Sequence, residues 1–573
     1  MNTQQLYEQW LANATEDSDL VKELESIKND ENAIYDRFYR ELEFGTAGLR
    51  GVLGAGTNRM NIYVIRYATQ GLANYLKKNY KNPSVAIAGD SRIKSDVFTK
   101  EAARVLAGNG IKVYIARELQ PTPVVSFCVR ELKCQAGIMV TASHNPAKYN
   151  GYKCYGSDGC QMTDDNANAV YSEIQSIDIF KDIQLVDFED GLASGMIEYI
   201  DDSVYDSYIA NVKKQSVNAG ACENSGLKVV YTPLNGAGNV LVRRVLAEIG
   251  IDDVTVVKEQ EMPDGNFTTC PYPNPEIQEA LQLGLDLCKK TGADLLLATD
   301  PDSDRVGIAV KLADGSYRLM TGNETGIMLT NYILSCRKAM NNLPENPFVV
   351  KTIVTTELIQ KICDKYGCEL RNVLTGFKYI GEQILRLEEK GEENRYIFGF
   401  EESYGYLAGT YVRDKDAVVA SMLICEMAAY YRKQGKSLDE VITQLYKEFG
   451  YYKNKTVSFE FEGASGLDRM NGIMSGLREN TSISEIAGRK IEVINDYKLS
   501  TKTDKATNTV ETINLPKSNV IAYMFNDGCS ITVRPSGTEP KIKLYITGVG
   551  KDEAQATAVV EELITAGKTL MGV

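Results

Sequence analysis

A strand–helix–strand pattern recurs three times along the first 400 or so residues, and this recurrence constrains the fold more than any other feature. Each repeat begins with a short apolar strand, continues with an amphipathic helix that ends at glycine, and returns as a second apolar strand. The expected strand pairs cover 85–90 with 111–116, 227–233 with 251–257, and 348–356 with 369–374. Glycine-closed helices between apolar strands are typical of parallel α/β units. The sequence therefore predicts three related α/β domains.

Each repeat continues with another helix and a further apolar strand, and each of these strands ends in a polar motif. The strands cover 136–140, 293–298 and 395–400, and the motifs that follow them are TASHNP (141–146), TDPDSDR (299–305) and EESYG (401–405). Ligands of open α/β sheets gather at the carboxyl ends of strands. Because the motifs hold equivalent places in the three repeats, we expect them to form three walls of one cleft.

The two ends of the chain differ from the repeats. The first 40 residues are typical of one or two amphipathic helices outside the first repeat. After a polar segment at 451–515, strands are expected at 520–525, 530–534 and 541–548, followed by a helix over 551–570. This pattern predicts a smaller C-terminal α+β domain. With about 150 residues per domain, we expect four domains, at 1–205, 206–320, 321–450 and 451–573.

The composition excludes several classes of protein. The 573 residues carry a net charge of −14, so the surface repels polyanions and nucleic acid is not an expected partner. No apolar run approaches the roughly 18 residues that cross a bilayer, and the N-terminus lacks the pattern of a signal peptide. The 12 cysteines have no close metal-binding spacing and are expected to be reduced thiols. We therefore expect a cytoplasmic protein with no membrane partner.

The first polar motif offers a nucleophile. Asn145-Pro146 is expected to force a tight turn that projects Ser143. A serine hydroxyl is a weak nucleophile unless a base or a metal activates it. His144, the only histidine of the chain, is its neighbour, although adjacent residues on a turn need not touch. No GxSxG elbow is present, so serine hydrolysis is disfavoured, and both residues remain catalytic candidates.

The second motif offers a metal site. Asp300, Asp302 and Asp304 stand at alternate positions after an apolar strand. In an extended segment such side chains point the same way, so we expect them to converge on one divalent cation. A calcium loop of the EF-hand type is excluded, because Arg305 and Lys311 stand where glycine and glutamate are needed. Three carboxylates, a phosphate oxygen and water suit Mg²⁺.

A loop between the last two expected strands is typical of a phosphate site. Arg534 offers a bidentate fork to phosphate, and Ser536, Gly537 and Thr538 add hydroxyls and bare backbone N–H groups. No Walker A sequence is present, so the site is not of the nucleotide type. The third motif adds Glu401 and Ser403, whose side chains are suited to sugar hydroxyls.

Two further segments are less specific by themselves. Lys378, in GFK at the end of an expected strand, could donate or accept a proton. The glycine-rich turn FGTAGLRG at 44–51 presents Arg50.

Six segments together resemble the α-D-phosphohexomutase superfamily, and specifically its phosphoglucomutase/phosphopentomutase branch. They are FGTAGLRG (44–51), TASHNPAKYNGYK (141–153), DPDSDR (300–305), GFKYIGE (376–382), GFEESYGY (399–406) and RPSGTEPK (534–541). They occur in the family's order and span almost the whole chain. The resemblance implies three related α/β domains around a central cleft and a smaller C-terminal α+β domain that closes over the substrate.

The resemblance also implies a role for each matching residue. Ser143 would be the phosphoserine, and its phosphate would hold Mg²⁺ together with Asp300, Asp302 and Asp304. The other implied roles are proton transfer for His144, Lys153 and Lys378, without a decision among them; recognition of sugar hydroxyls for Glu401 and Ser403; binding of the non-reacting phosphate for Arg534, Ser536, Gly537 and Thr538; and lining of the cleft for Arg50 and Arg305.

The activity implied by the resemblance is an isomerisation of small sugar phosphates. Phosphoserine 143 would convert glucose 1-phosphate to glucose 6-phosphate through a bound glucose 1,6-bisphosphate, which also serves as activator. The motif GFEESYG fits glucose or pentose phosphates better than mannose phosphates. A phosphopentomutase, a glucose 1,6-bisphosphate synthase, and a phosphatase or non-catalytic sensor remain alternatives. The sequence does not determine the oligomeric state. All mutase hypotheses require Ser143 to lie beside the three aspartates.

Overall fold

The computed structural model describes residues 2–42, 44, 48–461, 463–480, 482–536 and 541–573. The chain divides into two compact units, which we describe separately. The first unit comprises Met1–Gly322 and Ile380–Ser437, and the second comprises Asn323–Tyr379 and Leu438–Val573. Across the described residues, none of the helices combines the length and the apolarity that a bilayer crossing requires.

Three short helices begin the first unit, where the sequence predicted one or two. They are α1 (Thr3–Asn13), α2 (Ser18–Ser26) and α3 (Glu31–Phe38). Each has its own N-cap, because the side chains of Asn2, Asp17 and Asp30 accept backbone N–H groups of the first turns. These three caps divide the segment into separate helices.

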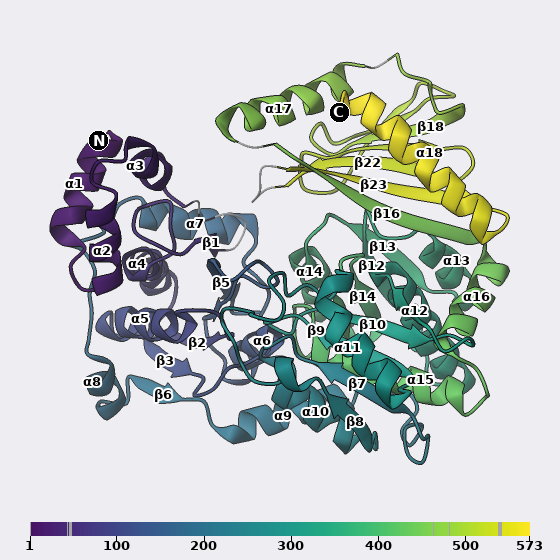
Figure 1. Ribbon diagram of the computed structural model, residues 1–573, viewed down its shortest axis with the longest axis horizontal. Helices are drawn as coiled ribbons and strands as arrows, with labels where there is room; N and C mark the ends of the chain where they lie inside the picture. The colour runs from purple at the N-terminus through teal and green to yellow at the C-terminus, as the bar shows by residue number, and fades with distance from the viewer. Residues whose placement is uncertain (1, 43, 45–47, 462, 481, 537–540) are drawn as a thin grey trace. The chain divides into compact units, whose positions relative to one another are not determined.

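A six-stranded mixed sheet forms the core of the first α/β domain (Figure 1). Its order is β1-β5-β4-β2-β3-β6, with β2, β3, β4 and β6 parallel and β1 and β5 antiparallel to their neighbours. The strands are β1 (Gly48–Val52), β2 (Ser84–Gly89), β3 (Lys112–Ile115), β4 (Ala136–Val140), β5 (Tyr149–Gly156) and β6 (Ile197–Tyr199). The helices are α4 (Ile62–Asn79), α5 (Ser95–Gly108), α6 (Thr122–Glu131), α7 (Asp164–Ile174), α8 (Phe188–Ala193) and α9 (Asp202–Lys213).

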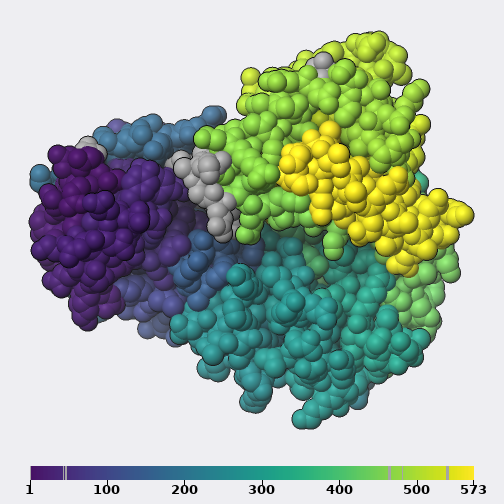
Figure 2. All heavy atoms as spheres, turned by 45° about the horizontal axis from the view of Figure 1, so that its top comes forward, coloured from purple at the N-terminus to yellow at the C-terminus, as the bar shows by residue number. Residues whose placement is uncertain are grey.

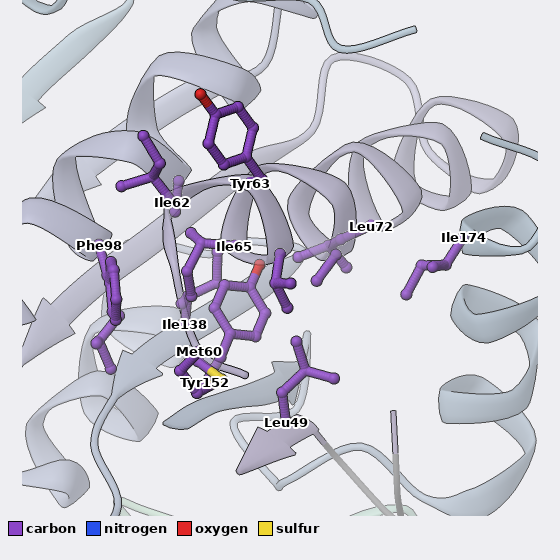
Figure 3. Packing of buried hydrophobic residues seen from close by; sticks show 14 of the residues in the cluster. Leu49, Met60, Ile62, Tyr63, Ile65, Leu72, Phe98, Ile138, Tyr152 and Ile174 are labelled. Carbon is purple, nitrogen blue, oxygen red and sulfur yellow. The ribbon is translucent and has the colours of Figure 1, made fainter. Parts of the chain in front are cut away.

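The core of this domain lies between α4 and the sheet. Figure 3 shows Ile65 of α4 beside Ile138 of β4 and Tyr152 of β5, all fully buried. Burying one such aliphatic side chain contributes about 1.5–3 kcal/mol. The packing fixes β4 and β5, and with them the loop that joins the two strands.

The second α/β domain repeats the arrangement with a five-stranded sheet of order β11-β10-β9-β7-β8. Strand β7 is parallel to β8 and β9, whereas β10 and β11 are antiparallel additions. The elements are β7 (Lys228–Thr232), α10 (Gly238–Glu248), β8 (Asp253–Val256), η1 (Lys258–Gln260), α11 (Gln278–Thr291), β9 (Leu295–Thr299), β10 (Val306–Lys311) and β11 (Tyr317–Met320).

The rest of the first unit comes from the third repeat. Strands β14 (Tyr396–Phe400) and β15 (Tyr406–Ala408) are antiparallel, and the buried helix α15 (Ala417–Arg432) follows them. A 3₁₀ turn, η2 (Glu393–Arg395), precedes β14. In all three repeats the polar motif therefore joins a buried strand to an antiparallel strand, at the place that the sequence predicted.

The second unit holds the first half of the third repeat. Its strands β12 (Phe348–Thr352) and β13 (Glu369–Val373) are parallel, as the sequence predicted. The accompanying helices are α12 (Gly322–Ala339), α13 (Leu358–Tyr366), α16 (Leu438–Phe449) and α14 (Phe377–Glu388), which continues into the first unit.

The C-terminal part of the second unit is an eight-stranded sheet with the helix α18 (Glu553–Met571) packed against β23. Figure 2 shows α18 in yellow with its outer face at the surface. The strand path is β16-β23-β22-β21-β18-β19-β20, and β17 pairs with β18. The elements are β16 (Tyr451–Glu460), α17 (Gly463–Glu479), β17 (Glu485–Ile486), β18 (Arg489–Asp496), β19 (Thr501–Asp504), β20 (Val510–Thr512), β21 (Ile521–Phe525), β22 (Ser530–Pro535) and β23 (Lys541–Gly550).

The polar segment at 451–515 contains more regular structure than the sequence indicated. Strand β16 pairs with β23 along its whole length, yet most of its side chains are exposed or half-buried because it lies at the edge of the sheet. An edge strand needs few apolar residues, so its periodicity is weak.

Candidate active site

The candidate nucleophile lies in the loop between β4 and β5. Ser143 is 3% exposed and has a φ of +53°, in the left-handed region that non-glycine residues seldom adopt. Its backbone N–H donates to Thr141 Oγ1 over 2.8 Å. Asn145 N–H donates to the carbonyl oxygen of Ala142, which closes the turn.

Arg92, which the sequence analysis did not single out, holds this loop in place. Its guanidinium donates to the carbonyl oxygens of Pro146 at 3.1 Å and Tyr149 at 3.0 Å, and also to those of Ser143 and Asn145. The Arg92 side chain is fully buried and pairs with Asp90, 3.4 Å away. Four carbonyl oxygens on one planar cation define the shape of the loop.

The three aspartates converge in the loop after β9, but not by the geometry that the alternation suggested. The segment 300–304 is a turn rather than an extended strand, and Ser303 has a φ of +48°. Asp300 Oδ1 accepts the backbone N–H groups of Asp304 at 3.1 Å and Arg305 at 3.0 Å. The carboxylates meet because the chain folds around Asp300, and each has an oxygen within 4.8 Å of the others.

The nucleophile and the aspartates meet directly. Ser143 Oγ donates to Asp300 Oδ2 over 3.0 Å and lies 3.2 Å from Nδ1 of His144. The sequence could not predict the first distance, because Ser143 and Asp300 are 157 residues apart. It could not predict the second either, because neighbouring side chains on a turn need not touch. This contact is the geometry that every mutase hypothesis required.

The chemistry of the carboxylates fits a hard divalent cation. Asp300, Asp302 and Asp304 are each at most 1% exposed. Burial, and then the charges of Asp302 and Asp304, raise the pKa of Asp300 well above its usual value. Asp302 Oδ1 and Asp304 Oδ1 are buried and have no hydrogen-bond partner among the described residues. Buried carboxylate oxygens that accept no hydrogen bond need another partner, and a divalent cation would supply it.

Two lysines, the buried Lys153 and the half-buried Lys415, contact the other oxygens of these carboxylates. Lys153 Nζ lies 2.7 Å from Asp302 Oδ2 and 3.1 Å from Asp304 Oδ2. Lys415 Nζ lies 3.2 Å from Asp304 Oδ2 and 3.1 Å from Asp414 Oδ1. Although burial opposes ionisation, the charge and hydrogen bond of Lys153 lower the pKa of Asp302. Lys415 lies in a charged run after β15 that has no sequence signal, so the sequence analysis missed it.

The third motif adjoins the loop at 300–305 that carries the three aspartates. Arg305 and Gly405 form an isolated antiparallel bridge, and Val306 N–H donates to the carbonyl oxygen of Tyr404 over 3.1 Å. Glu401 is 4% exposed, and Ser403 is half-buried. The structure thus brings the second motif into contact with both the first and the third, whereas the cleft that the three motifs were expected to line stays a prediction.

Arg50 and Arg305, which were expected to line the cleft, also lie in this unit. Arg50 of β1 donates to Asn145 Oδ1 over 3.4 Å. Arg305 pairs with Glu276 at 3.3 Å and lies 3.7 Å from Asp304 Oδ1.

The remaining predicted residues belong to the second unit. Lys378 is 7% exposed and lies in the first turn of α14, after Gly376 with a φ of +121°, whereas the sequence placed it at the end of a strand. Arg534 and Ser536 are half-buried at the end of β22, where Ser536 N–H donates to the carbonyl oxygen of Lys541 over 2.7 Å. Gly537 and Thr538 lie outside the described residues.

Known proteins share both the sequence and the fold of this chain. Solved structures of a putative phosphomannomutase from Thermus thermophilus and of parafusin, a phosphoglucomutase from Paramecium, match with TM-scores of 0.69 and 0.68. They cover 92% and 93% of this chain and 99% and 96% of their own chains, at 21% and 18% identity, and so show the fold.

Curated relatives are more similar in sequence. A protein named phosphoglucomutase from Staphylococcus saprophyticus is 37% identical over 543 residues, covering 94% of this chain and 95% of that protein. A phosphoglucomutase from Staphylococcus aureus is 38% identical over 510 residues, covering 89% and 90%. Residues 41–180, 206–314 and 321–449 match the α/β/α domains I, II and III of phosphoglucomutase/phosphomannomutase, and 489–566 match its C-terminal domain. The chain therefore belongs to the phosphoglucomutase/phosphomannomutase family of the α-D-phosphohexomutase superfamily.

Proposed function

We propose that this chain is a phosphoglucomutase that interconverts glucose 1-phosphate and glucose 6-phosphate through a phosphorylated Ser143. The observation that carries the proposal is the 3.0 Å contact between Ser143 Oγ and Asp300 Oδ2 inside a buried cluster of three aspartates. The name phosphoglucomutase of the curated relatives, at 36–38% identity, supports glucose as the sugar.

We assign Mg²⁺ to Asp300, Asp302 and Asp304, with an oxygen of the Ser143 phosphate as a further ligand. A magnesium ion there would neutralise charge on the transferring phosphoryl group. The support is that, among the described residues, neither Asp302 Oδ1 nor Asp304 Oδ1 accepts a hydrogen bond.

The reaction consists of two phosphoryl transfers on the same serine. In the first, the O6 hydroxyl of glucose 1-phosphate bonds to phosphorus and gives up its proton, while the bond from phosphorus to the Ser143 oxygen breaks and that oxygen takes up a proton. In the second, the resulting glucose 1,6-bisphosphate has turned around. The Ser143 hydroxyl now bonds to the phosphorus on O1 and gives up its proton, while the bond from phosphorus to O1 breaks and O1 takes up a proton. Positioning and fixed charges supply most of the acceleration in phosphoryl transfer.

His144 is our candidate for exchanging a proton with the serine oxygen, since its Nδ1 lies 3.2 Å from Oγ. Lys153 is held by Asp302 and Asp304, so we assign it to charge balance beside the phosphoryl group. Lys378 remains the candidate for the proton of the sugar hydroxyl.

The other assignments follow from the family's motifs. Glu401 and Ser403 would bind sugar hydroxyls, Arg50 and Arg305 would line the site, and the non-reacting phosphate would be held by Arg534, Ser536, Gly537 and Thr538. Glucose 1,6-bisphosphate would be the activator, since it can phosphorylate Ser143. The matched family regions support the division into domains at 1–205, 206–320, 321–450 and 451–573, which stays a proposal. All 12 cysteines are buried and form no disulfide, which supports a cytoplasmic location.

The decisive experiment compares the wild-type protein with Ser143→Ala. Intact mass after incubation with glucose 1,6-bisphosphate should rise by one phosphoryl group in the wild type and stay constant in the variant. Conversion of glucose 1-phosphate should be lost in the variant and, after removal of Mg²⁺ with a chelator, in the wild type. Mutase activity in Ser143→Ala would overturn the covalent mechanism.

The same assay separates the alternative activities. Faster turnover of ribose 1-phosphate than of glucose 1-phosphate would indicate a phosphopentomutase. Release of glucose 1,6-bisphosphate into solution as the main product would indicate a synthase.

A further inference from the structure

The carboxylates of Asp302 and Asp304 each have one oxygen bound by the protein and one left without a donor. Asp302 Oδ2 accepts Lys153 Nζ at 2.7 Å and the hydroxyl of Thr122 at 2.8 Å. Asp304 Oδ2 lies 3.1 Å from Lys153 Nζ and 3.2 Å from Lys415 Nζ. Among the described residues, neither Oδ1 atom has a hydrogen-bond partner. In both neighbouring carboxylates, therefore, one oxygen contacts donors of the protein and the other does not.

This difference between Oδ1 and Oδ2 limits how each carboxylate can bind a metal. A carboxylate oxygen has two lone pairs, and each Oδ2 here is contacted by two donors, so only Oδ1 of each carboxylate is left to bind a cation. Removing either donor would free one lone pair of Oδ2 for bidentate binding. Ca²⁺ takes six to eight oxygen ligands at about 2.3–2.6 Å and often binds carboxylates through both oxygens. Mg²⁺ needs octahedral geometry at about 2.0–2.1 Å and is satisfied by single oxygens and water.

Lys415 is the less expected of the two lysines, and several features of the fold fix it. Asp414 Oδ1 lies 3.1 Å from its Nζ, and the side chain is only 12% exposed. A Cβ atom at Gly405 would lie 2.3 Å from Lys415 Cδ, so only glycine leaves room for the lysine stem. Ala417 N–H donates to the carbonyl oxygen of Ser303 over 3.3 Å, which ties the segment that carries Lys415 to the loop at 300–305.

We propose that Lys415 is a positioning residue that, together with Lys153 and Thr122, restricts Asp302 and Asp304 to one oxygen each and thereby selects Mg²⁺ over Ca²⁺. The inference rests on the metal site of the proposed function. The preference for Mg²⁺ then depends on residues that do not themselves bind the ion.

A purely electrostatic role predicts a different result. If Lys415 only balanced negative charge, its removal would strengthen the binding of every divalent cation by the same factor. If it blocks Asp304 Oδ2, its removal strengthens Ca²⁺ more than Mg²⁺, because only Ca²⁺ uses the second oxygen. The ratio of the two affinities therefore separates the roles, whatever happens to either affinity alone.

The test is calorimetric titration of the full-length protein with MgCl₂ and with CaCl₂, for the wild type and Lys415→Met. We expect the wild type to prefer Mg²⁺, and we expect the preference to fall by about tenfold or more in the variant, which corresponds to about 1.4 kcal/mol. Thr122→Val, which removes one donor from Asp302 Oδ2 and leaves Lys153, should lower the preference by less. Lys311→Met is the matched control, because Lys311 Nζ donates to the carbonyl oxygen of Gly292 in the same domain, away from the carboxylates.

Circular dichroism must first show that each variant is folded. If Lys415→Met does not fold, Lys415→Gln takes its place, since its side chain is one bond shorter and should no longer reach Asp304 Oδ2. An unchanged ratio in the folded Lys415 variant, with tight Mg²⁺ binding by the wild type, would overturn this inference and leave the proposed function intact. Absence of divalent-ion binding by the wild type would overturn both.

Discussion

Ser143 and Arg534 lie at the ends of strands and are both proposed to hold phosphate, but their surroundings differ. Ser143 is almost fully buried, and its loop is fixed by a buried arginine, a pair of threonine hydrogen bonds and a contact with Asp300. Arg534 is half-buried at the end of β22 in the other unit, close to a backbone hydrogen bond from Ser536 to Lys541. A group that reacts has to be held rigidly before the substrate arrives, whereas a group that only binds the substrate can be held by fewer contacts.

The largest effect should come from a change at the reacting centre that preserves shape. Asp304→Asn keeps the volume of the side chain but removes one negative charge. Metal binding contributes several kcal/mol of transition-state stabilisation, so kcat should fall about a thousandfold or more. Steady-state kinetics at saturating Mg²⁺ measure this loss.

Asp314→Asn, in the exposed turn before β11, is the matched control and should keep its activity. A fall of less than tenfold in Asp304→Asn would show that the aspartate cluster is structural and would remove the contrast between the two loops.

The next largest effect should come from a change in the support of the loop that carries Ser143. Arg92→Met removes the cation shared by four carbonyl oxygens and leaves Asp90 buried without its charge partner. Losing one member of a buried pair costs about 3–5 kcal/mol, and displacing a reacting group by about 1 Å costs about a hundredfold in rate. The free energy of unfolding, measured with denaturant, and kcat should therefore both fall in the variant.

Arg104→Met, which breaks a partly exposed pair with Glu101, provides the comparison and should cost at most about 1 kcal/mol. If Arg92→Met were as stable and as active as the wild type, the loop would not need Arg92 to hold it rigid.

A change in the phosphate loop should affect binding more than chemistry. Arg534→Ala removes a charge-assisted hydrogen-bond donor worth about 1.5–3 kcal/mol. If this donor contacts the non-reacting phosphate equally in the ground and transition states, KM should rise about 10- to 100-fold while kcat stays nearly constant. Arg489→Ala on the same sheet, which breaks pairs with Asp527 and Glu562, is the control. A lower kcat at unchanged KM would place Arg534 with the reacting groups instead.

The smallest effect should come from an ion pair outside both loops. The hydrogen bond from Arg66 lowers the pKa of Glu16 below its ordinary value of 4.5, against an opposing effect of burial. A lowered folded-state pKa means that the stabilisation is complete above pH 4.5 and is lost as the pH falls through the folded value. Because Glu16 is half exposed, we expect less than about 1 kcal/mol.

Denaturant unfolding of the wild type and Glu16→Gln at several pH values measures this difference. The two proteins should differ at pH 7 and converge in acid. A difference that persists at pH 3 would mean that the contribution is not the charge of Glu16.

Sequence patterns predicted most elements of the three repeats but failed where the signal was not periodic. Strand β16 escaped because an edge strand can be polar, and the caps at Asn2, Asp17 and Asp30 divided a region that was expected to form fewer helices. Lys378 was placed at the end of a strand, whereas α14 begins at Phe377, directly after Gly376 with its φ of +121°. These errors are local, and none of them moves a polar motif away from its strand end.

By itself, the sequence determined that apolar strands and glycine-closed helices alternate, because side-chain periodicity is a local property, and that a polar motif follows one strand in each repeat. Tertiary structure alone decided which atoms meet. The contact between Ser143 and Asp300 joins residues that are 157 positions apart. Arg92, Thr122 and Lys415 belong to none of the motifs that the sequence analysis described. Which oxygen of Asp302 or Asp304 is bound and which is left without a donor depends on Lys153 in β5, Thr122 at the start of α6 and Lys415 in the loop after β15. That arrangement exists only once the chain has folded.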